Sequence, residues 1–289
     1  MGDGPSPAVA RRRLRIELRN TRLAIEGLTQ EAVAEAMVWH VSKIIRIEQG
    51  QVTISVNDLK ALLSSYGVTD EAHVAELVEL AKLSRQRSWW DDYSDVLQSG
   101  PFRQFIEFES AASSIRGYQP VMVPGLLQTE AYAENVIPEF ARNVSRATAE
   151  KLVRLRMRRQ ELIDREDGPS LHFVLDEAPL HRLVGDASVM RRQLSHLVDL
   201  ATRPNLSIHV VPFTMSLNRA TQAPFVLAEF GDATDDDVLF LETFRSDLIV
   251  RDDHGQVSEY RRMFKELQER SLGPGDSIAK IRTISDEFA

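Results

Sequence analysis

The 289-residue chain contains no cysteine, which excludes disulfide bonds and thiolate metal sites. It also lacks the run of about eighteen apolar residues that a membrane-spanning helix needs, so we expect no membrane span. Its basic N-terminal stretch is not followed by an apolar segment, and we therefore expect no secretory signal. Hydrophobic residues at 43% and charged residues at 27% are typical of a chain with a buried core. These features favour a cytoplasmic protein.

Acidic residues outnumber basic ones, and the net charge of −8 at first argues against a nucleic-acid partner. The distribution of charge changes that conclusion. Residues 1–60 carry nine Lys/Arg against seven Asp/Glu, a net charge of +2, which leaves −10 for the remainder. Phosphate binding depends on the local field rather than on the charge of the whole chain. The basic residues gather further in one short segment, which holds Arg11, Arg12, Arg13, Arg15, Arg19 and Arg22.

No pattern in the chain indicates an enzyme, a cofactor or a metal site. The seven histidines have no metal-ligand spacing. Asp176 and Glu177 follow a predicted strand and could act as catalytic carboxylates, but no nucleophile or phosphate loop accompanies them. A structural charge at the start of a helix is the favoured interpretation. We expect no cofactor, no metal and no catalysis.

Apolar residues at helical spacing predict five short helices in residues 1–85, which would form an all-α N-terminal domain. Gly27, Gly50 and Gly67 mark the ends of three of them, and Asn57 is a candidate cap for the fourth. The expected helices cover about 8–26, 29–37, 40–49, 57–66 and 70–87.

Residues 86–289 predict a second domain with a small mixed sheet, so the expected fold class is α+β. Strands are expected at 171–175, 206–212, 225–230, 238–241 and 248–250. Helices are expected near 101–114, 126–136, 148–165, 188–201, 257–270 and 278–284. Residues 118–125 hold two prolines and predict a loop.

The segment from Gly27 to Gly50 has the pattern of two short helices joined by a tight turn. Thr29 can cap the first helix, and Ile44 and Ile47 can anchor the second. In a helix-turn-helix the second helix enters the major groove with its N-terminal residues towards the base edges. We therefore predict that double-stranded DNA is contacted by Gln30, His40, Val41, Ser42, Lys43 and Arg46. Gln30 could bind a phosphate or brace a DNA-reading residue.

This segment resembles the phage-repressor-like (XRE, Cro/C1-type) helix-turn-helix family. The resemblance is carried by Leu28-Thr29-Gln30-Glu31, Ala34 and Ile44-Ile45-Arg46-Ile47-Glu48-Gln49-Gly50.

Two residues depart from the family pattern. Val38 stands where glycine is usual, so we expect a turn conformation open to a β-branched residue. Ile45 stands where a small polar residue is common and could contact thymine methyl groups or a partner. The alternative is a helical module that has kept the fold but no longer binds DNA.

Later motifs extend the resemblance over nearly the whole chain. They include Ser88-Trp89-Trp90, Val123-Pro124-Gly125-Leu126-Leu127-Gln128-Thr129 and Asp176-Glu177-Ala178-Pro179-Leu180. These motifs resemble actinobacterial regulators that join a helix-turn-helix to a C-terminal domain called DUF5753. The resemblance implies a transcription regulator, often encoded beside a small DUF397-type protein that is a candidate partner. It implies no known ligand.

Two groups of residues in the predicted second domain leave their roles open. The first group could line an effector pocket or seal a contact between domains, and consists of Trp89, Trp90, Tyr93 and Tyr118. The second group could touch DNA or an acidic partner, although a solvated helix face is favoured, and consists of Arg154, Arg156, Arg158 and Arg159.

A single helix-turn-helix reads only a few base pairs, so specific binding usually needs two half-sites about one helical turn apart. We therefore predict a homodimer, with the C-terminal domain supplying much of its interface. The alternative is a protein-binding module that pairs with a small DUF397-type neighbour in an antitoxin-like complex.

Overall fold

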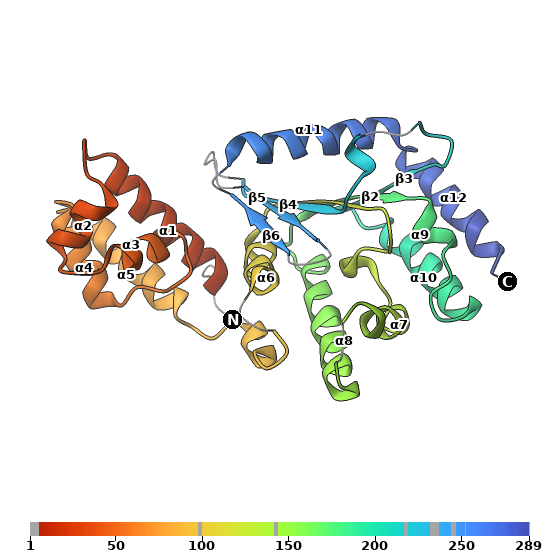
Figure 1. The fold of residues 1–289 in the computed structure, drawn as a ribbon, viewed down its shortest axis with the longest axis horizontal. Coiled ribbons are helices and arrows are strands. Elements are labelled where there is room, and N and C mark those ends of the chain that lie inside the picture. Colours follow the sequence, from red (N-terminus) through yellow and green to blue (C-terminus); the bar gives the residue numbers. More distant parts are fainter. Residues whose placement is uncertain are drawn as a thin grey trace. The chain divides into compact units, whose positions relative to one another are not determined.

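A computed structural model of the chain describes residues 6–97, 100–141, 144–216, 219–231, 237–243, 247–251 and 253–288. The backbone divides into two compact units, Met1–Asp92 and Tyr93–Ala289. Helices make up the described part of the first unit, whereas the second combines helices with a mixed six-stranded sheet (Figure 1). The expected α+β fold class is thereby confirmed.

The first unit contains the expected series of short helices, each begun by a polar cap. Their bounds are α1 Pro7–Leu23, α2 Gln30–Ala36, α3 Val41–Glu48, α4 Val56–Ser65 and α5 Glu71–Ser84. The Thr29 hydroxyl caps α2 by accepting the Ala32 N–H at 3.2 Å. For α4 the predicted cap Asn57 is wrong, because Ser55 accepts the Asp58 N–H at 3.0 Å and starts the helix two residues earlier.

Apolar residues from all five helices form one core in the first unit. Leu14 and Leu18 of α1 pack in the same cluster as Ile44 and Ile47 of α3. The basic residues of α1 partly join this interior, since Arg12, Arg15 and Arg22 are buried. Much of the local positive charge therefore serves packing within the unit, and Arg13 remains exposed.

The sheet of the second unit has the strand order β3-β2-β1-β4-β5-β6. Its strands are β1 Ser114–Gln119, β2 Ser170–Asp176, β3 Leu206–Val211, β4 Phe225–Glu229, β5 Val238–Leu241 and β6 Leu248–Val250. The first three strands run parallel, and β4, β5 and β6 continue the sheet in antiparallel pairs.

Strand β1 lies at the centre of this sheet and was not predicted. The sequence placed a helix up to residue 114 and a loop from 118, whereas Ser114–Gln119 pairs with β2 on one side and β4 on the other. Arg116 and Gly117 interrupt the run of β-branched and aromatic residues that marks a strand. Gly117 suits this position because an added Cβ would lie only 3.0 Å from the ring of Phe173 on β2.

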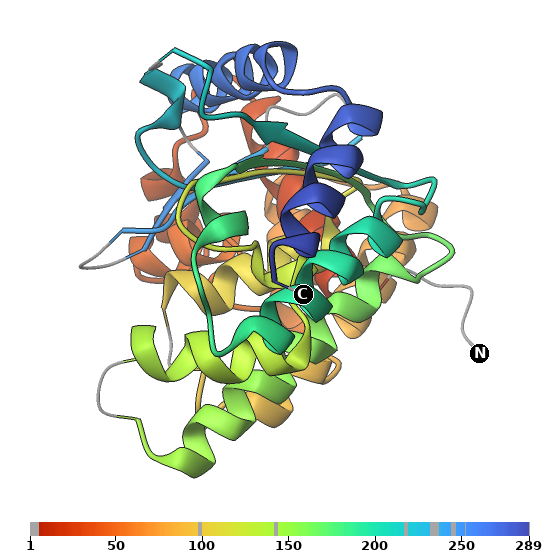
Figure 2. The ribbon, with the colours of Figure 1, turned by 90° about the vertical axis from the view of Figure 1, so that its right-hand side faces the viewer.

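Helices cover both faces of the sheet. One face is covered by α11 His254–Arg270, whose Val257, Phe264 and Leu267 form a cluster with strand residues. The opposite side carries the remaining long helices, with α12 beside β3, as Figures 1 and 2 show. These helices are α6 Pro101–Ala111, α7 Glu130–Phe140, α8 Arg146–Gln160, α10 Ala187–Leu200 and α12 Pro274–Asp286. The short helices are η1 Trp89–Tyr93, η2 Gly125–Leu127, η3 Glu161–Ile163, α9 Ala178–His181 and η4 Arg219–Thr221.

Within the described residues, no helix has both the length and the apolar character required to cross a bilayer. The same residues contain no group of three or more His, Asp or Glu side chains placed to hold a metal ion.

Candidate nucleic-acid interface

The turn between α2 and α3 places Val38 in the left-handed region of backbone conformation, with φ of 53°. The Val38 N–H donates to the Glu35 carbonyl at 3.1 Å, and the Trp39 N–H donates to the Ala34 carbonyl at 2.8 Å. These two bonds close α2 as a Schellman motif, which favours glycine at this position. The expectation of a turn open to a β-branched residue is therefore wrong. The turn keeps the geometry that suits glycine, and valine occupies it.

The end of α3 repeats this geometry with the residue that it favours. Gly50 has φ of 67°, and its N–H donates to the Ile47 carbonyl at 2.9 Å. The Gln51 N–H donates to the Arg46 carbonyl at 2.8 Å. The C-terminal ends of both helices are thus fixed by backbone hydrogen bonds, so α3 is a short helix of defined length.

The start of α3 is organised by the first of the predicted DNA contacts. His40 caps the helix, and its Nδ1 accepts the Ser42 N–H at 3.3 Å. The same Nδ1 lies 2.9 Å from the Ser42 hydroxyl oxygen. Both side chains are exposed, so the imidazole and the hydroxyl form a linked polar group at the leading end of the helix. Val41 between them packs partly against the core.

The two cations of α3 have different surroundings. The Lys43 ammonium lies 3.0 Å from an oxygen of Asp58 and 3.6 Å from the centre of the Trp39 ring. Arg46 is exposed and has no ion pair within the described residues. Arg46 can therefore meet a phosphate or a guanine without breaking an internal contact, whereas Lys43 must leave Asp58. An exposed pair of this kind costs little to break. Ile45 between them is half-buried.

Gln30 is tied to a buried ion pair that the sequence interpretation missed. The Arg22 guanidinium donates to both oxygens of Glu48, at 2.6 and 2.8 Å, and to the Leu28 carbonyl at 3.1 Å. The Gln30 amide donates to Glu48 at 2.6 Å. One carboxylate at the end of α3 thus joins α1 and the first turn of α2. The sequence signal was Glu48 within the Ile44–Gly50 motif, whose partner lies 26 residues earlier.

The electrostatics favour the charged form of Arg22. The hydrogen bond to Glu48 raises the pKa of Arg22, outweighing the opposing effect of burial. Burial, and then the nearby Glu48 carboxylate, raise the pKa of Tyr66 to about 12. Arg22 is therefore charged and Tyr66 neutral near neutral pH. The position of α3 relative to α1 is held by a charged, hydrogen-bonded contact.

The structure thus places five of the six predicted contacts on α3, from its cap residue His40 to Arg46 in its last turn, and the sixth, Gln30, at the start of α2. The buried face of α3, with Ile44 and Ile47, fixes which side of the helix remains outside. A short helix with this outward polar face has the form that enters a DNA major groove. The individual contacts with DNA stay predictions.

The four aromatic residues proposed for an effector pocket lie in different settings. Trp90 is buried and its ring meets Trp89 edge to face, with 5.5 Å between centres. The Lys151 ammonium lies 5.9 Å from the centre of the Tyr93 ring. Tyr118 is fully buried in β1, where it packs with Phe225. Tyr118 therefore belongs to the core beneath α11.

The carboxylates at the end of β2 serve structural contacts. The Asp176 side chain accepts the Ala178 N–H at 3.0 Å, at the first residue of α9. Glu177 is buried, and its oxygens contact the Lys280 ammonium at 2.6 Å and the Phe213 N–H at 2.8 Å. These contacts agree with the favoured reading of a structural charge at a helix start.

Comparison with known families adds independent evidence for both parts of the chain. A family model described as "Domain of unknown function (DUF5753)" matches residues 102–283. A second, described as "Helix-turn-helix domain", matches residues 11–77. The helix-turn-helix and the DUF5753 domain that the sequence motifs predicted are both confirmed. No curated protein and no solved structure matches the chain.

Proposed function

Because this chain belongs to the DUF5753 family and is a DNA-binding regulator by its helix-turn-helix domain, we propose that it is a sequence-specific transcription regulator. It binds an operator as a homodimer, and its second unit modulates that binding. The proposed role is binding, with no catalytic step.

The observation that supports this proposal is the construction of α3. Apolar side chains anchor one face of the helix, while His40, Ser42 and Arg46 stand exposed on the other. Exposed donors and acceptors on a helix of this size suit the base edges of the major groove. The internal contacts of Gln30 and Lys43 support a role in positioning α3, and we propose that both residues also contact phosphates, in addition to any base contact.

The test is a salt-titrated binding assay on the promoter region that surrounds the native gene. We expect that DNA to bind more tightly than random competitor, and equal affinity for both would contradict sequence-specific recognition. Arg46→Ala and Lys43→Ala should each weaken specific binding by about 1–3 kcal/mol if they read bases. Lys82→Ala, on α5 and exposed, is the matched control that removes one positive charge from the same unit.

A small DUF397-type protein is proposed as the modulating partner of the second unit. Its support is the family resemblance, in which the two proteins are often encoded side by side. Co-expression with the adjacent gene product, followed by light scattering, gives the stoichiometry of any complex. Failure of the two proteins to co-purify would remove this partner from the proposal without affecting DNA binding.

A further inference from the structure

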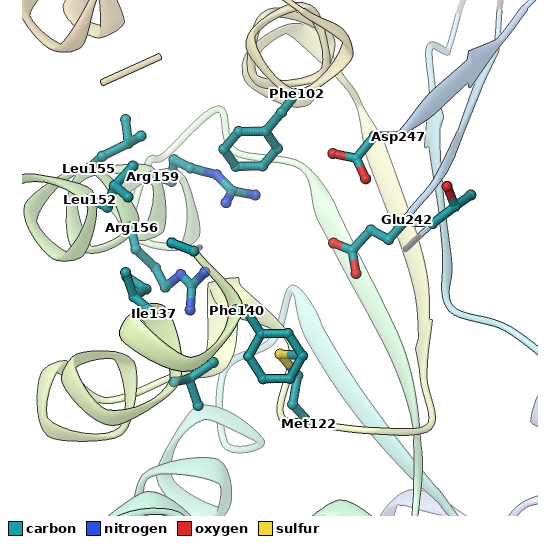
Figure 3. Close-up of a pocket in the computed structure, with 13 residues that line it drawn as sticks. Phe102, Met122, Ile137, Phe140, Leu152, Leu155, Arg156, Arg159, Glu242 and Asp247 are labelled. Atoms are coloured by element: carbon teal, nitrogen blue, oxygen red, sulfur yellow. The ribbon is translucent and has the colours of Figure 1, made fainter. Parts of the chain in front are cut away.

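The second unit contains a cavity of about 440 Å³ on the side of the sheet opposite α11. Its lining comes from α7 and α8, from Phe102 of α6 and from Met122, Glu242, Thr243 and Asp247 (Figure 3). This volume lies within the range of small-molecule sites in proteins. None of the aromatic residues at positions 89, 90, 93 and 118 lines it.

Two neighbouring arginines of α8 reach this cavity in different electrostatic states. Arg159 is buried and donates to both oxygens of Glu109, at 2.8 and 2.7 Å, so its charge is neutralised. Arg156 donates to the neutral amide oxygen of Gln128 at 2.6 Å and has no ion pair within the described residues. A guanidinium carries five N–H donors, and the bond to Gln128 uses one of those on Arg156, which also lines the cavity.

The position of Arg156 is set by its hydrogen bond to the loop at 123–129, which is itself held by further hydrogen bonds. The Gln128 side chain is buried and also donates to the Val123 carbonyl at 2.6 Å. The Gln160 amide of α8 donates to the carbonyls of Gly125 and Gln128 at 2.9 and 2.8 Å. The loop at 123–129 is therefore tied to α8 at two levels, and the guanidinium is held in place before any ligand arrives.

Carboxylates stand on the opposite side of the cavity. Figure 3 shows Glu242 and Asp247 facing the two arginines across the open space. Glu242 accepts a hydrogen bond from the Gln119 amide at 2.9 Å and lines the cavity. Arg156 and Glu242 thus present opposite charges that do not contact each other directly.

Protein surroundings affect both charges. Burial, and then the neighbouring Arg159, lower the pKa of Arg156 to about 10, so it stays protonated near neutral pH. Burial raises the pKa of Glu242, with a further contribution from Asp247. An anion beside the guanidinium and a cation beside the carboxylate would each relieve an unfavourable charge.

The remaining walls of the cavity are apolar. Phe102 and Phe140 lie on opposite sides of the space in Figure 3, with Met122 beside Phe140 and Leu152 and Leu155 next to the arginines. A site of mostly apolar walls with a few fixed polar groups is the usual form of a small-molecule pocket.

We propose that this cavity binds a small zwitterion with an apolar side group, the chemistry of an amino acid. The carboxylate lies at Arg156, the ammonium at Glu242, and the side group between Phe102 and Phe140. The binding site itself is independent of the proposed function. The role of the ligand as an effector of operator binding rests on that function.

The test is isothermal titration of the full chain with L-phenylalanine, L-leucine and L-methionine, in the absence of DNA. We expect one site per chain for at least one of them. For L-phenylalanine, two analogues probe the charges: phenylalaninamide lacks the carboxylate, and 3-phenylpropanoate lacks the ammonium. Each should bind at least about tenfold more weakly than the amino acid. Absence of saturable binding by all three amino acids would overturn the proposal, as would equal binding of either analogue.

Variants locate the site. Arg156→Met and Glu242→Gln should each weaken binding at least about tenfold. Arg154→Met changes an exposed arginine of the same helix and should leave binding unchanged. Thermal melting of each variant checks its folding, and Glu242→Gln keeps the test decisive if Arg156→Met fails to fold. Unchanged affinity in a folded Arg156→Met or Glu242→Gln variant would place the ligand elsewhere and overturn the proposal.

The titrations separate this inference from the proposed function. A chain that binds the amino acid but shows no operator preference would refute only the regulator proposal. A chain that binds its operator and none of the amino acids would refute only the ligand site.

Discussion

Val38 is the residue with the clearest conformational cost in the DNA-binding unit. It is 92% exposed, so its side chain gains almost nothing from burial, yet its backbone is left-handed. A left-handed conformation costs roughly 1–2 kcal/mol for a residue with a Cβ atom. The equivalent positions after α3 and α4 hold Gly50 and Gly67 at φ of 67° and 72°. The same turn is therefore made with and without strain in one small unit.

Val38→Gly should stabilise the chain. Relief of the strained backbone outweighs the cost of about 0.5–1 kcal/mol that glycine adds through its freedom in the unfolded state. A net gain of about 0.5–1 kcal/mol is expected, seen as a rise of a few degrees in Tm by circular dichroism.

The reciprocal control is Gly67→Val, at the same position of α4. A Cβ added at Gly67 meets no atom within 4 Å, so any loss reports backbone strain and not a clash. We expect Tm to fall in this variant. A Val38→Gly variant that melts at or below the temperature of the parent chain would show that the turn is not strained.

At the scale of elements, the Arg22–Glu48 pair connects α1, the start of α2 and the end of α3. Both side chains are less than 10% exposed. Removing one partner leaves a buried charge without compensation, which typically costs about 3–5 kcal/mol. We therefore expect Glu48→Gln to destabilise the chain by about that amount in urea unfolding.

Replacing both partners with apolar residues tests the origin of this loss. The double variant Arg22→Met, Glu48→Leu should recover most of the stability, because no charge remains buried. The exposed pair Lys82–Glu79 supplies the control, since Lys82→Ala should cost at most about 1 kcal/mol. A Glu48→Gln variant as stable as the Lys82→Ala variant would mean that the buried pair contributes little.

Glu177 plays a comparable connecting role in the second unit, at the junction of β2, α9 and α12. Burial opposes its ionisation, but hydrogen bonds from Lys280, Phe213 N–H and His181 outweigh burial and lower the pKa of the carboxyl group. A carboxyl pKa that is lower in the folded state contributes stability above the unfolded value of about 4.3. That contribution is lost as the pH falls through the folded pKa.

Glu177→Gln should therefore lower the stability at pH 7 and reduce the further loss on acidification below about pH 4. Urea unfolding at a series of pH values measures both effects. Glu266→Gln, on the exposed side of α11, is the matched control and should follow the parent chain. An unchanged pH profile in Glu177→Gln would show that its ion pairs do not stabilise the fold.

At the scale of the whole molecule, the proposal predicts a spacing rule. Two copies of α3 in a homodimer reach half-sites about 10 base pairs apart, on one side of the duplex. Inserting about 5 base pairs between the half-sites turns one of them to the opposite side and should abolish specific binding of the dimer. Footprinting and gel shifts on matched operators measure this effect.

Sedimentation of the free protein supplies the second part of that test. We expect a dimer at the concentrations that saturate the operator. Binding of a single half-site as tightly as the full operator, by a monomeric chain, would contradict the dimer.

The features that the sequence determined by itself are local in the chain. Caps such as Thr29, stop signals such as Gly50 and the helical spacing of Ile44 and Ile47 act within a few residues, so the helix-turn-helix could be predicted before its structure was known. The family motifs lie in the same short segments. Val38 was recognised as a departure, although its left-handed backbone came only from the structure.

The tertiary structure decided the contacts between residues that are distant in sequence. Ser114–Gln119 becomes a strand because β2 and β4 supply hydrogen bonds on both sides, which no local pattern reports. Arg154 and Arg156 look alike in a basic run, yet only Arg156 faces the cavity. Its distinction depends on Gln128 and on Glu242, which lie 28 and 86 residues away. Charge and spacing along the chain predicted the helix that carries Arg156. The packing of α8 against the distant 123–129 loop, and the cavity that it shares with Glu242, determined what that arginine can bind.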